Sequence, residues 1–233
     1  MSYFPRGVRW LLAINTGVFL LCYLGGSSVQ SYVRVFLALS AEAAVRHLFI
    51  WQVFTYMFVH FGIMHWLFNM LFLWMVGMPV EQAWGMRRFL KFYLLCGLAA
   101  GICALLADLL VRDSVTFGAS GAVMGLFVAF AILFPDATIL VFLIFPMPAK
   151  YGVMIYVAVD LLMTLGGGNS GVSTVAHLGG AAFAYVYLKH GLPAVRLRLP
   201  DVRGAYRQWK LQRAKKKFQV YMRKHSGRDP WVN

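Results

Sequence analysis

A serine and a histidine lie near the starts of two strongly apolar segments of this chain. Ser120 is near the head of the run 118–134, and His177 lies about one and a half turns into the run 172–188. Polar side chains are costly inside a bilayer and usually mark function there. Because a serine becomes a strong nucleophile only when a base takes its proton, the pair predicts nucleophilic catalysis, with Ser120 as nucleophile and His177 as general base.

Two glycines flank the serine in the string Gly118-Ala119-Ser120-Gly121. Glycine lets another backbone approach closely, as a peptide that reacts with Ser120 must. The unpaired N–H groups of a helix start can also stabilise the negative charge that develops on an attacked carbonyl oxygen. Taken alone, the string is equally compatible with a simple helix cap.

A second polar group precedes the serine in the sequence. His65 and Asn69 are four residues apart and share one helix face. Both can donate hydrogen bonds, which predicts an oxyanion site, although they could instead bond to each other and fix helix packing. His60 is off that face, and we expect it to anchor the preceding loop. The chain has no H-E-x-x-H pattern, so we expect no metal and no cofactor.

The composition is that of a membrane protein. Hydrophobic residues make up 61% of the 233 and charged residues 13%, whereas soluble domains are about half apolar and one quarter charged. A spanning helix needs roughly 20 residues, and six apolar segments reach or approach that length. They are 10–26, 62–80, 89–111, 118–134, 151–165 and 172–188.

The segments between the predicted spans differ in character. Residues 27–61 mix apolar and charged side chains, which favours one or two amphipathic helices in the membrane interface. The run 139–145 is too short to span and leads to Pro146 and Pro148, so we expect a connector or a shallow re-entrant piece. Small residues recur at four-residue spacing in the fourth and the sixth predicted spans, which carry Ser120 and His177, and this favours close packing of those two helices.

The charge pattern predicts the topology and a tail. Of the 22 lysines and arginines, twelve follow residue 191, and the net charge of the chain is +14. The positive-inside rule then places the tail, the N-terminus and the turn with Arg87 and Arg88 in the cytoplasm. We therefore expect a membrane domain at 1–191, with Ser120 and His177 toward the outer face, and a basic tail at 192–233. Its interleaved aromatic residues favour anionic lipid headgroups over nucleic acid, and a solvated tail that only sets the topology is equally compatible with the sequence.

Three motifs in order resemble the rhomboid intramembrane serine proteases. They are H-x4-H-x3-N (His60, His65, Asn69), G-x-S-G (Gly118 to Gly121) and A-H-x2-G (Ala176, His177, Gly180), and the match covers roughly residues 1–191. The resemblance implies an all-α bundle of six transmembrane helices and a Ser120–His177 dyad. It also implies an oxyanion site built from the Ser120 backbone, His65 and Asn69, and transmembrane helices as substrates. Glu81 and Gly85 also resemble a family pattern and are expected to be structural.

This chain departs from the family pattern at two positions. An aromatic residue often lies four after the serine, where this chain has Met124, and Trp-Arg is frequent where this chain has Trp51-Gln52. A thioether can still contact an imidazole ring, so neither change removes a catalytic group. Asp160 is an acid in the middle of a span. We do not include it in the catalytic set, because the family uses a dyad, and we expect it to face a polar pocket or to bond to a neighbouring helix.

Two other functions are compatible with parts of this pattern. A catalytically weak or inactive rhomboid-like protein would bind transmembrane helices without cutting them, although such relatives usually lack the serine or the histidine. A small transporter would also place polar groups near mid-span, but the chain has no inverted repeat. The family plan favours a multi-pass protein of a prokaryotic cytoplasmic (inner) membrane.

Overall fold

The computed structural model describes residues 4–111, 114–141, 144–165, 171–190, 211–215 and 221. The chain divides into two units, Met1–Gly191 and Leu192–Asn233. In the second unit only a short helical stretch at 211–215 and Tyr221 are described, so most of the predicted lipid-binding tail lies outside the described residues. The first unit carries every candidate site residue.

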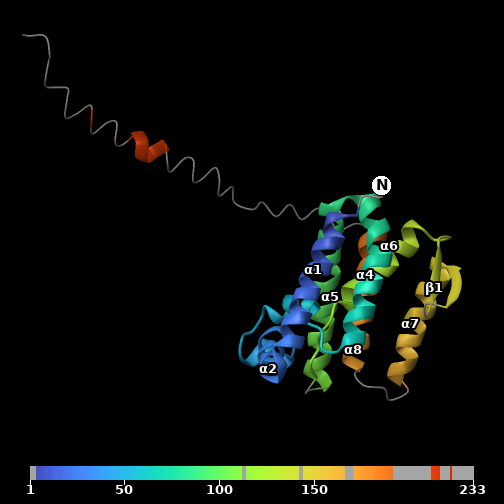
Figure 1. The fold of residues 1–233 in the computed structure, drawn as a ribbon, viewed down its shortest axis with the longest axis horizontal. Helices are drawn as coiled ribbons and strands as arrows, with labels where there is room; N and C mark the ends of the chain where they lie inside the picture. Colours follow the sequence, from blue (N-terminus) through green and yellow to red (C-terminus); the bar gives the residue numbers. More distant parts are fainter. Residues whose placement is uncertain are drawn as a thin grey trace, which may run out of the picture. The chain divides into compact units, whose positions relative to one another are not determined.

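Six longer helices occupy the six apolar segments predicted from the sequence (Figure 1). They are α1 (Arg6–Leu24), α4 (Ile63–Trp84), α5 (Met86–Val111), α6 (Ser120–Leu133), α7 (Ala149–Leu165) and α8 (Gly171–His190). Within the described part of the chain, α1, α4 and residues Met86–Leu110 of α5 are long and apolar enough to cross a membrane, and α6 is a shorter apolar helix. The count of six spans therefore stays a prediction.

Small residues allow the helices around α6 to approach closely, as predicted. A side chain at Gly180 of α8 would collide with the backbone carbonyl of Gly121 in α6. On the other faces, a Cβ at Gly125 would lie 2.6 Å from the Cys96 sulfur, and a Cβ at Gly179 would lie 2.6 Å from the Cys103 sulfur. Two of the three cysteines thus fill space next to glycines in the helix contacts.

The loop between α1 and α4 is built from four short helical pieces. They are α2 (Gly26–Leu37), the π-helical turn η1 (Glu42–Arg46), α3 (Gln52–Thr55) and the 3-10 turn η2 (Tyr56–Phe58). Apolar side chains such as Tyr32, Leu48 and Ile50 are exposed on it. The interfacial position of this loop remains a prediction.

Gln52, one of the two departures from the family pattern, anchors the loop internally. Its side chain is fully buried, donates to the Val35 carbonyl at 2.7 Å and accepts from the Ser40 amide at 3.3 Å. The neighbouring Trp51 indole donates to the Phe36 carbonyl at 2.8 Å. The glutamine therefore replaces a charged residue with an amide that satisfies two backbone groups of the loop.

The run 139–145 was expected to be a connector or a shallow re-entrant piece, and it does connect α6 to α7, but through two strands, so the purely helical fold needs correction. Strands β1 (Thr138–Val141) and β2 (Phe145–Pro148) form an antiparallel hairpin in which Thr138 pairs with Pro148 and Val141 with Phe145. The β-branched residues of β1 and the two prolines of β2 favour extended backbone, and the proline rings keep β2 from extending a larger sheet.

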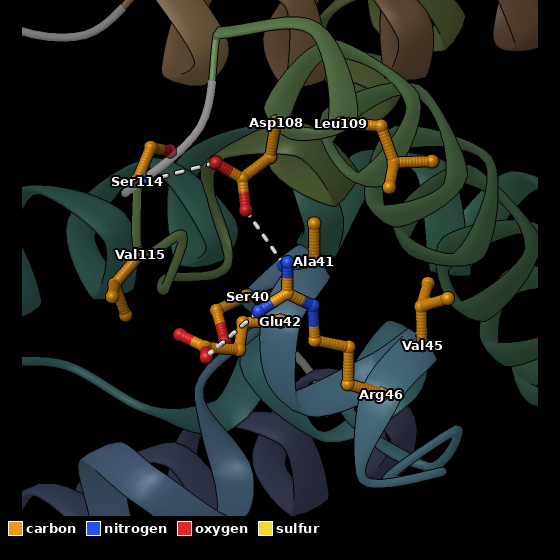
Figure 2. Close-up of a pocket in the computed structure, with 9 residues that line it drawn as sticks. All are labelled: Ser40, Ala41, Glu42, Val45, Arg46, Asp108, Leu109, Ser114 and Val115. Atoms are coloured by element: carbon orange, nitrogen blue, oxygen red, sulfur yellow. Dashed lines mark hydrogen bonds and ion pairs between the residues drawn. The ribbon is translucent and has the colours of Figure 1, made fainter.

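A polar pocket lies between η1 and the end of α5 (Figure 2). Its volume is about 540 Å³, and none of the predicted site residues lines it. Asp108 is 4% exposed and accepts from the amides of Ala41 at 2.6 Å and Ser114 at 2.9 Å, while Glu42 pairs with Arg46 at 3.5 Å. The Asp108 carboxylate thus ties the loop to the far end of α5.

The start of α1 is capped by a carboxylate from another helix. Glu81 is 5% exposed, and its two oxygens accept from the amides of Gly7 at 2.7 Å and Val8 at 2.6 Å. These amides have no partner within α1, and the positive end of the helix dipole attracts the negative charge. Gly85, with φ +78°, ends α4 directly after this contact. Both residues are structural, as the sequence predicts.

We expect Glu81→Gln to destabilise the protein by about 1–3 kcal/mol, because the amide side chain cannot accept from both backbone N–H groups and carries no charge. The measurement is the midpoint of thermal unfolding of the purified protein in detergent. Glu42→Gln is the matched control, since the Glu42 side chain is 65% exposed in a surface ion pair and should matter little. Equal midpoints for the two variants would contradict the capping role.

Candidate active site

Ser120 is the first residue of α6, and the turn before it is held by the loop after α2. Gly118 has φ +110°, a conformation that favours glycine, and its amide donates to the Tyr56 carbonyl at 3.0 Å. The next amide, of Ala119, donates to the His60 Nε2 atom at 3.2 Å. His60 is fully buried. This bond ties His60 to the turn that carries the serine, which is compatible with the anchoring role expected of it.

Tyr56 is a second anchor of this turn that sequence reasoning missed. Its hydroxyl donates to the Gly97 carbonyl of α5 at 2.7 Å while its own carbonyl holds Gly118. Its ring also fills the space beside Gly101, where a Cβ would lie 2.7 Å from the ring. A single tyrosine in an apolar loop gives no periodic signal, so only the pair of glycines in α5 hinted at a close neighbour.

The structure brings Ser120 and His177 into hydrogen-bond contact. The Ser120 Oγ lies 2.6 Å from the Nε2 atom of His177. This approach depends on the Gly121–Gly180 contact one residue beyond the serine and three beyond the histidine. A hydroxyl at this distance from an imidazole nitrogen can transfer its proton, which is the geometry that nucleophilic catalysis requires.

Asp160 of α7 lies on the opposite side of the same ring. Its Oδ2 atom is 3.0 Å from His177 Nδ1, and the side chains of both residues are 19% exposed. From the sequence, Asp160 was expected to face a polar pocket or to bond to a neighbouring helix, and it was not included in the catalytic set. The structure joins Ser120, His177 and Asp160 in one line of hydrogen bonds across three helices.

His65 lies against the glycine that precedes the serine. A Cβ at Gly118 would lie 2.6 Å from the His65 Cε1 atom, so the ring fills the space that glycine leaves. The ring also lies 5.2 Å from that of His60 and 5.6 Å from that of Phe117, measured between centroids. His65 therefore reaches the turn that carries Ser120, as an oxyanion donor would.

Asn69 and Met124 lie deeper in the bundle. The Asn69 Nδ2 atom donates to the His65 carbonyl at 2.8 Å, so one of its two N–H groups bonds within α4 rather than to a side chain. Met124, one turn after the serine, is 3% exposed. A role of Asn69 as oxyanion donor and a contact of Met124 with the His177 ring stay predictions.

Within the described residues, no group of three or more histidine, cysteine, aspartate or glutamate side chains is placed to hold a metal ion. The chemistry that this arrangement can perform with its own side chains is acyl transfer, in which a hydroxyl attacks a carbonyl and an imidazole moves the proton.

Residues 48–193 match the family described as the Rhomboid domain. The chain is 32% identical to Rhomboid protease GluP of Bacillus subtilis over 121 residues, which are 52% of this chain and 23% of that protein. It is 29% identical to Rhomboid protease AarA of Providencia stuartii over 172 residues, which are 63% of this chain and 60% of the relative.

A plant protein is similar to the chain at a comparable level. RHOMBOID-like protein 1 of Arabidopsis thaliana is 34% identical over 142 residues, which are 58% of this chain and 36% of that protein. The chain thus spans less than two thirds of the length of these curated relatives. Because they come from bacteria and from a plant, the prokaryotic origin expected from the sequence stays a prediction.

We expect Gly180→Ala to lower the stability of the protein by about 1–3 kcal/mol, because the added methyl group collides with the Gly121 carbonyl and forces α6 and α8 apart. Thermal unfolding in detergent measures the effect. Gly17→Ala in α1 is the control, since a Cβ there would meet nothing within 4 Å and alanine favours a helix. A Gly180→Ala protein as stable as Gly17→Ala would refute the close contact.

The stability of the protein should also depend on the neutral state of His60. Burial, helped by the neighbouring His65, lowers the pKa of His60 from 6.5 to about 3. The unfolded chain therefore binds a proton that the folded protein excludes, and stability is lost as the pH falls from about 6.5 toward about 3, by up to about 1.4 kcal/mol per pH unit. Thermal unfolding across this range, for wild type and His60→Gln, measures the effect. The variant should lose less stability, and identical pH profiles would contradict the assignment.

Proposed function

This chain belongs to the rhomboid family, since the Rhomboid domain match covers residues 48–193 of its 233, and on that premise we propose that it is an intramembrane serine endopeptidase. Ser120 is the nucleophile and His177 the general base. The observation that carries the proposal is the 2.6 Å distance between the Ser120 Oγ and the His177 Nε2. Two bacterial relatives, GluP and AarA, are named as proteases, which supports the same reaction class.

The proposed reaction proceeds through an acyl-enzyme. The Ser120 Oγ forms a bond to the substrate carbonyl carbon as its proton passes to His177 Nε2. When the tetrahedral intermediate collapses, the carbon–nitrogen bond breaks and His177 returns the proton to the leaving amine. Water then attacks the ester carbon as His177 takes a proton from it, and when the bond from that carbon to the Ser120 Oγ breaks, His177 returns the proton to the Oγ and the acid product leaves.

The negative oxygen of the intermediate needs hydrogen-bond donors close to Ser120. The amide of Ser120 belongs to the first turn of α6, where backbone N–H groups have no partner inside the helix. The neighbouring amide of Ala119 is occupied by His60, which leaves Ser120 as the backbone donor that we assign. The ring of His65 lies against Gly118 and supplies the second donor, and Asn69, one turn further along α4, supplies the third.

The substrates that we propose are transmembrane segments of other proteins. A helical peptide holds its carbonyls in hydrogen bonds, so it must unwind before Ser120 can attack. Residues that weaken a helix near the cut site would lower the free energy of this step. Hydrolysis also requires water, which fits a serine at a helix start rather than in the middle of a span.

We further propose that both termini face the cytoplasm and that the site faces the outer side. The cap of Glu81 on α1 places Arg6 and Arg9 at the same end of the bundle as Arg87 and Arg88 after α4. The contact of His65 with Gly118 joins the opposite end of α4 to the start of α6. If the basic end lies in the cytoplasm, Ser120 lies toward the outer face.

A rhomboid-like protein that binds transmembrane helices without cutting them is the second candidate. Several plant relatives are named RHOMBOID-like and not as proteases, such as RHOMBOID-like protein 2 of Arabidopsis thaliana, which is 41% identical over 76 residues, so family membership alone does not separate the two candidates. Against it, the serine and the histidine are both present and in contact.

The decisive experiment is cleavage of a transmembrane test substrate by the purified protein in detergent. Wild type should cut, whereas Ser120→Ala and His177→Ala should lose activity by a factor on the order of 10³ or more, because the nucleophile or its base is missing. A fluorophosphonate probe should label wild type and fail to label Ser120→Ala. Gly17→Ala in α1 serves as the control, since an added Cβ there would meet nothing within 4 Å.

Two outcomes would count against the proposal. Cleavage that survives in Ser120→Ala would assign the activity to another residue or to a contaminant. A wild-type protein that neither cuts any of several substrates nor reacts with the probe, yet binds transmembrane helices, would establish the second candidate.

A further inference from the structure

The two nitrogens of the His177 ring have different partners. Nε2 lies 2.6 Å from the Ser120 Oγ, and Nδ1 lies 3.0 Å from the Asp160 Oδ2. A carboxylate only accepts hydrogen bonds, so the contact with Asp160 requires the ring proton to be on Nδ1. Nε2 then carries the lone pair that faces the serine hydroxyl. The position of Asp160 thus selects the one neutral tautomer in which His177 can act as a base toward Ser120.

We propose that Asp160 is a positioning residue of the active site, so that this protein uses a serine–histidine–aspartate triad instead of a two-residue dyad. The inference rests on the proposed function of Ser120 and His177. Asp160 keeps its negative charge throughout. The proton that leaves Ser120 is bound by Nε2, the proton already on Nδ1 stays there, and the resulting positive ring faces the carboxylate.

The charges favour this arrangement most strongly during the reaction. An ionised carboxylate inside a helical bundle is costly, and the Asp160 side chain is 19% exposed. Before proton transfer the His177 ring is neutral and offers one hydrogen bond. After proton transfer it carries a full positive charge at the same 3.0 Å, where a low local dielectric strengthens the attraction. The contact is therefore stronger in the transition state than in the resting enzyme, which is the condition for accelerating the chemical step.

Aromatic packing fixes the side of α7 that carries Asp160. Tyr156 lies four residues before Asp160 and shares its helix face. Its ring stacks on Phe127 of α6, with centroids 5.7 Å apart, and meets the edge of Phe72 of α4 at 6.0 Å. α7 lies at the edge of the bundle, beside β1 (Figure 1). These contacts fix the orientation of α7 about its own axis, and in this orientation Asp160 faces His177.

The alternative role for Asp160 is a structural bond between α7 and α8. The two roles differ in what a change of the carboxylate does to the rate. In soluble triad proteases, replacing the carboxylate by its amide lowers kcat by roughly 10⁴, because the wrong tautomer is favoured. A structural bond would instead affect the stability of the fold and the binding of substrate, with little specific effect on kcat.

The test compares wild type, Asp160→Asn, Asp160→Glu and Asp136→Asn as full-length proteins in detergent. Asp136 forms an exposed ion pair with Lys150 at the start of α7. Asp136→Asn therefore makes the same chemical change next to this helix and controls for the loss of an acid there. We expect Asp160→Asn to lower kcat at least tenfold with little change in KM or in the unfolding midpoint, and to slow fluorophosphonate labelling of Ser120 in parallel. Asp160→Glu should retain more activity than Asp160→Asn, and Asp136→Asn should match wild type.

An Asp160→Asn protein with the kcat of wild type would overturn the triad. The triad would also be overturned if Asp160→Asn and Asp160→Glu lost kcat equally and both had a lowered unfolding midpoint. A readout independent of turnover separates this failure from that of the proposed function. The Nδ1 proton of His177 should give a far-downfield proton resonance in wild type that disappears in both Asp160→Asn and His177→Ala. If wild type cuts no substrate, this resonance still shows whether Asp160 accepts a hydrogen bond from His177. Its absence in wild type would refute the triad.

Discussion

The backbone contact between Gly121 and Gly180 is the constraint on which the rest of the site depends. It brings α6 and α8 closer than any side chain would allow, and both Ser120 and His177 lie within a turn of it. In a membrane the hydrophobic effect contributes little to the pairing of helices, because lipid tails are as apolar as the side chains. Close van der Waals packing between small residues stabilises the pair instead. The distance between Ser120 and His177 is thus set by two helices rather than by a loop.

Three acids of the described bundle, two of them buried and one partly exposed, each contact a group that donates hydrogen bonds. Glu81 and Asp108 accept backbone amides and fix the start of α1 and the loop beside α5. Asp160 instead faces an imidazole ring. Amides keep the same partial charge at all times, whereas an imidazole can become positive. The first two acids therefore stabilise a structure, and the third can respond to a reaction.

The sequence predicts the helices and the contact between Ser120 and His177 well, because both depend on local patterns. The apolar run that begins beside Ser120 marks a helix start, and the small residues around His177 mark a close helix partner. Asp160 could not be placed in this way. Its approach to His177 depends on the rotation of α7, which the contacts of Tyr156 with Phe127 and Phe72 determine, and no spacing within α7 reveals them.

The β1–β2 hairpin and the role of Tyr56 were missed for related reasons. The hairpin is shorter than a span, and its apolar residues have the composition of a membrane segment, so hydropathy alone could not identify strands. Tyr56 connects the loop to α5 and to the turn before Ser120, and both bonds involve backbone carbonyls or amides that any residue would offer. Such contacts follow from tertiary structure and leave no pattern in the sequence.

The carboxylate that caps α1 has a consequence for how the protein is made. Glu81 is 74 residues after Gly7, so the ribosome synthesises α1 well before the carboxylate that caps its first amides. Until Glu81 is available, the leading amides of α1 have only water or lipid headgroups as partners. The contact forms only after α4 has been inserted with Glu81 on the same side. Correct insertion of the second long helix is therefore a condition for completing the first.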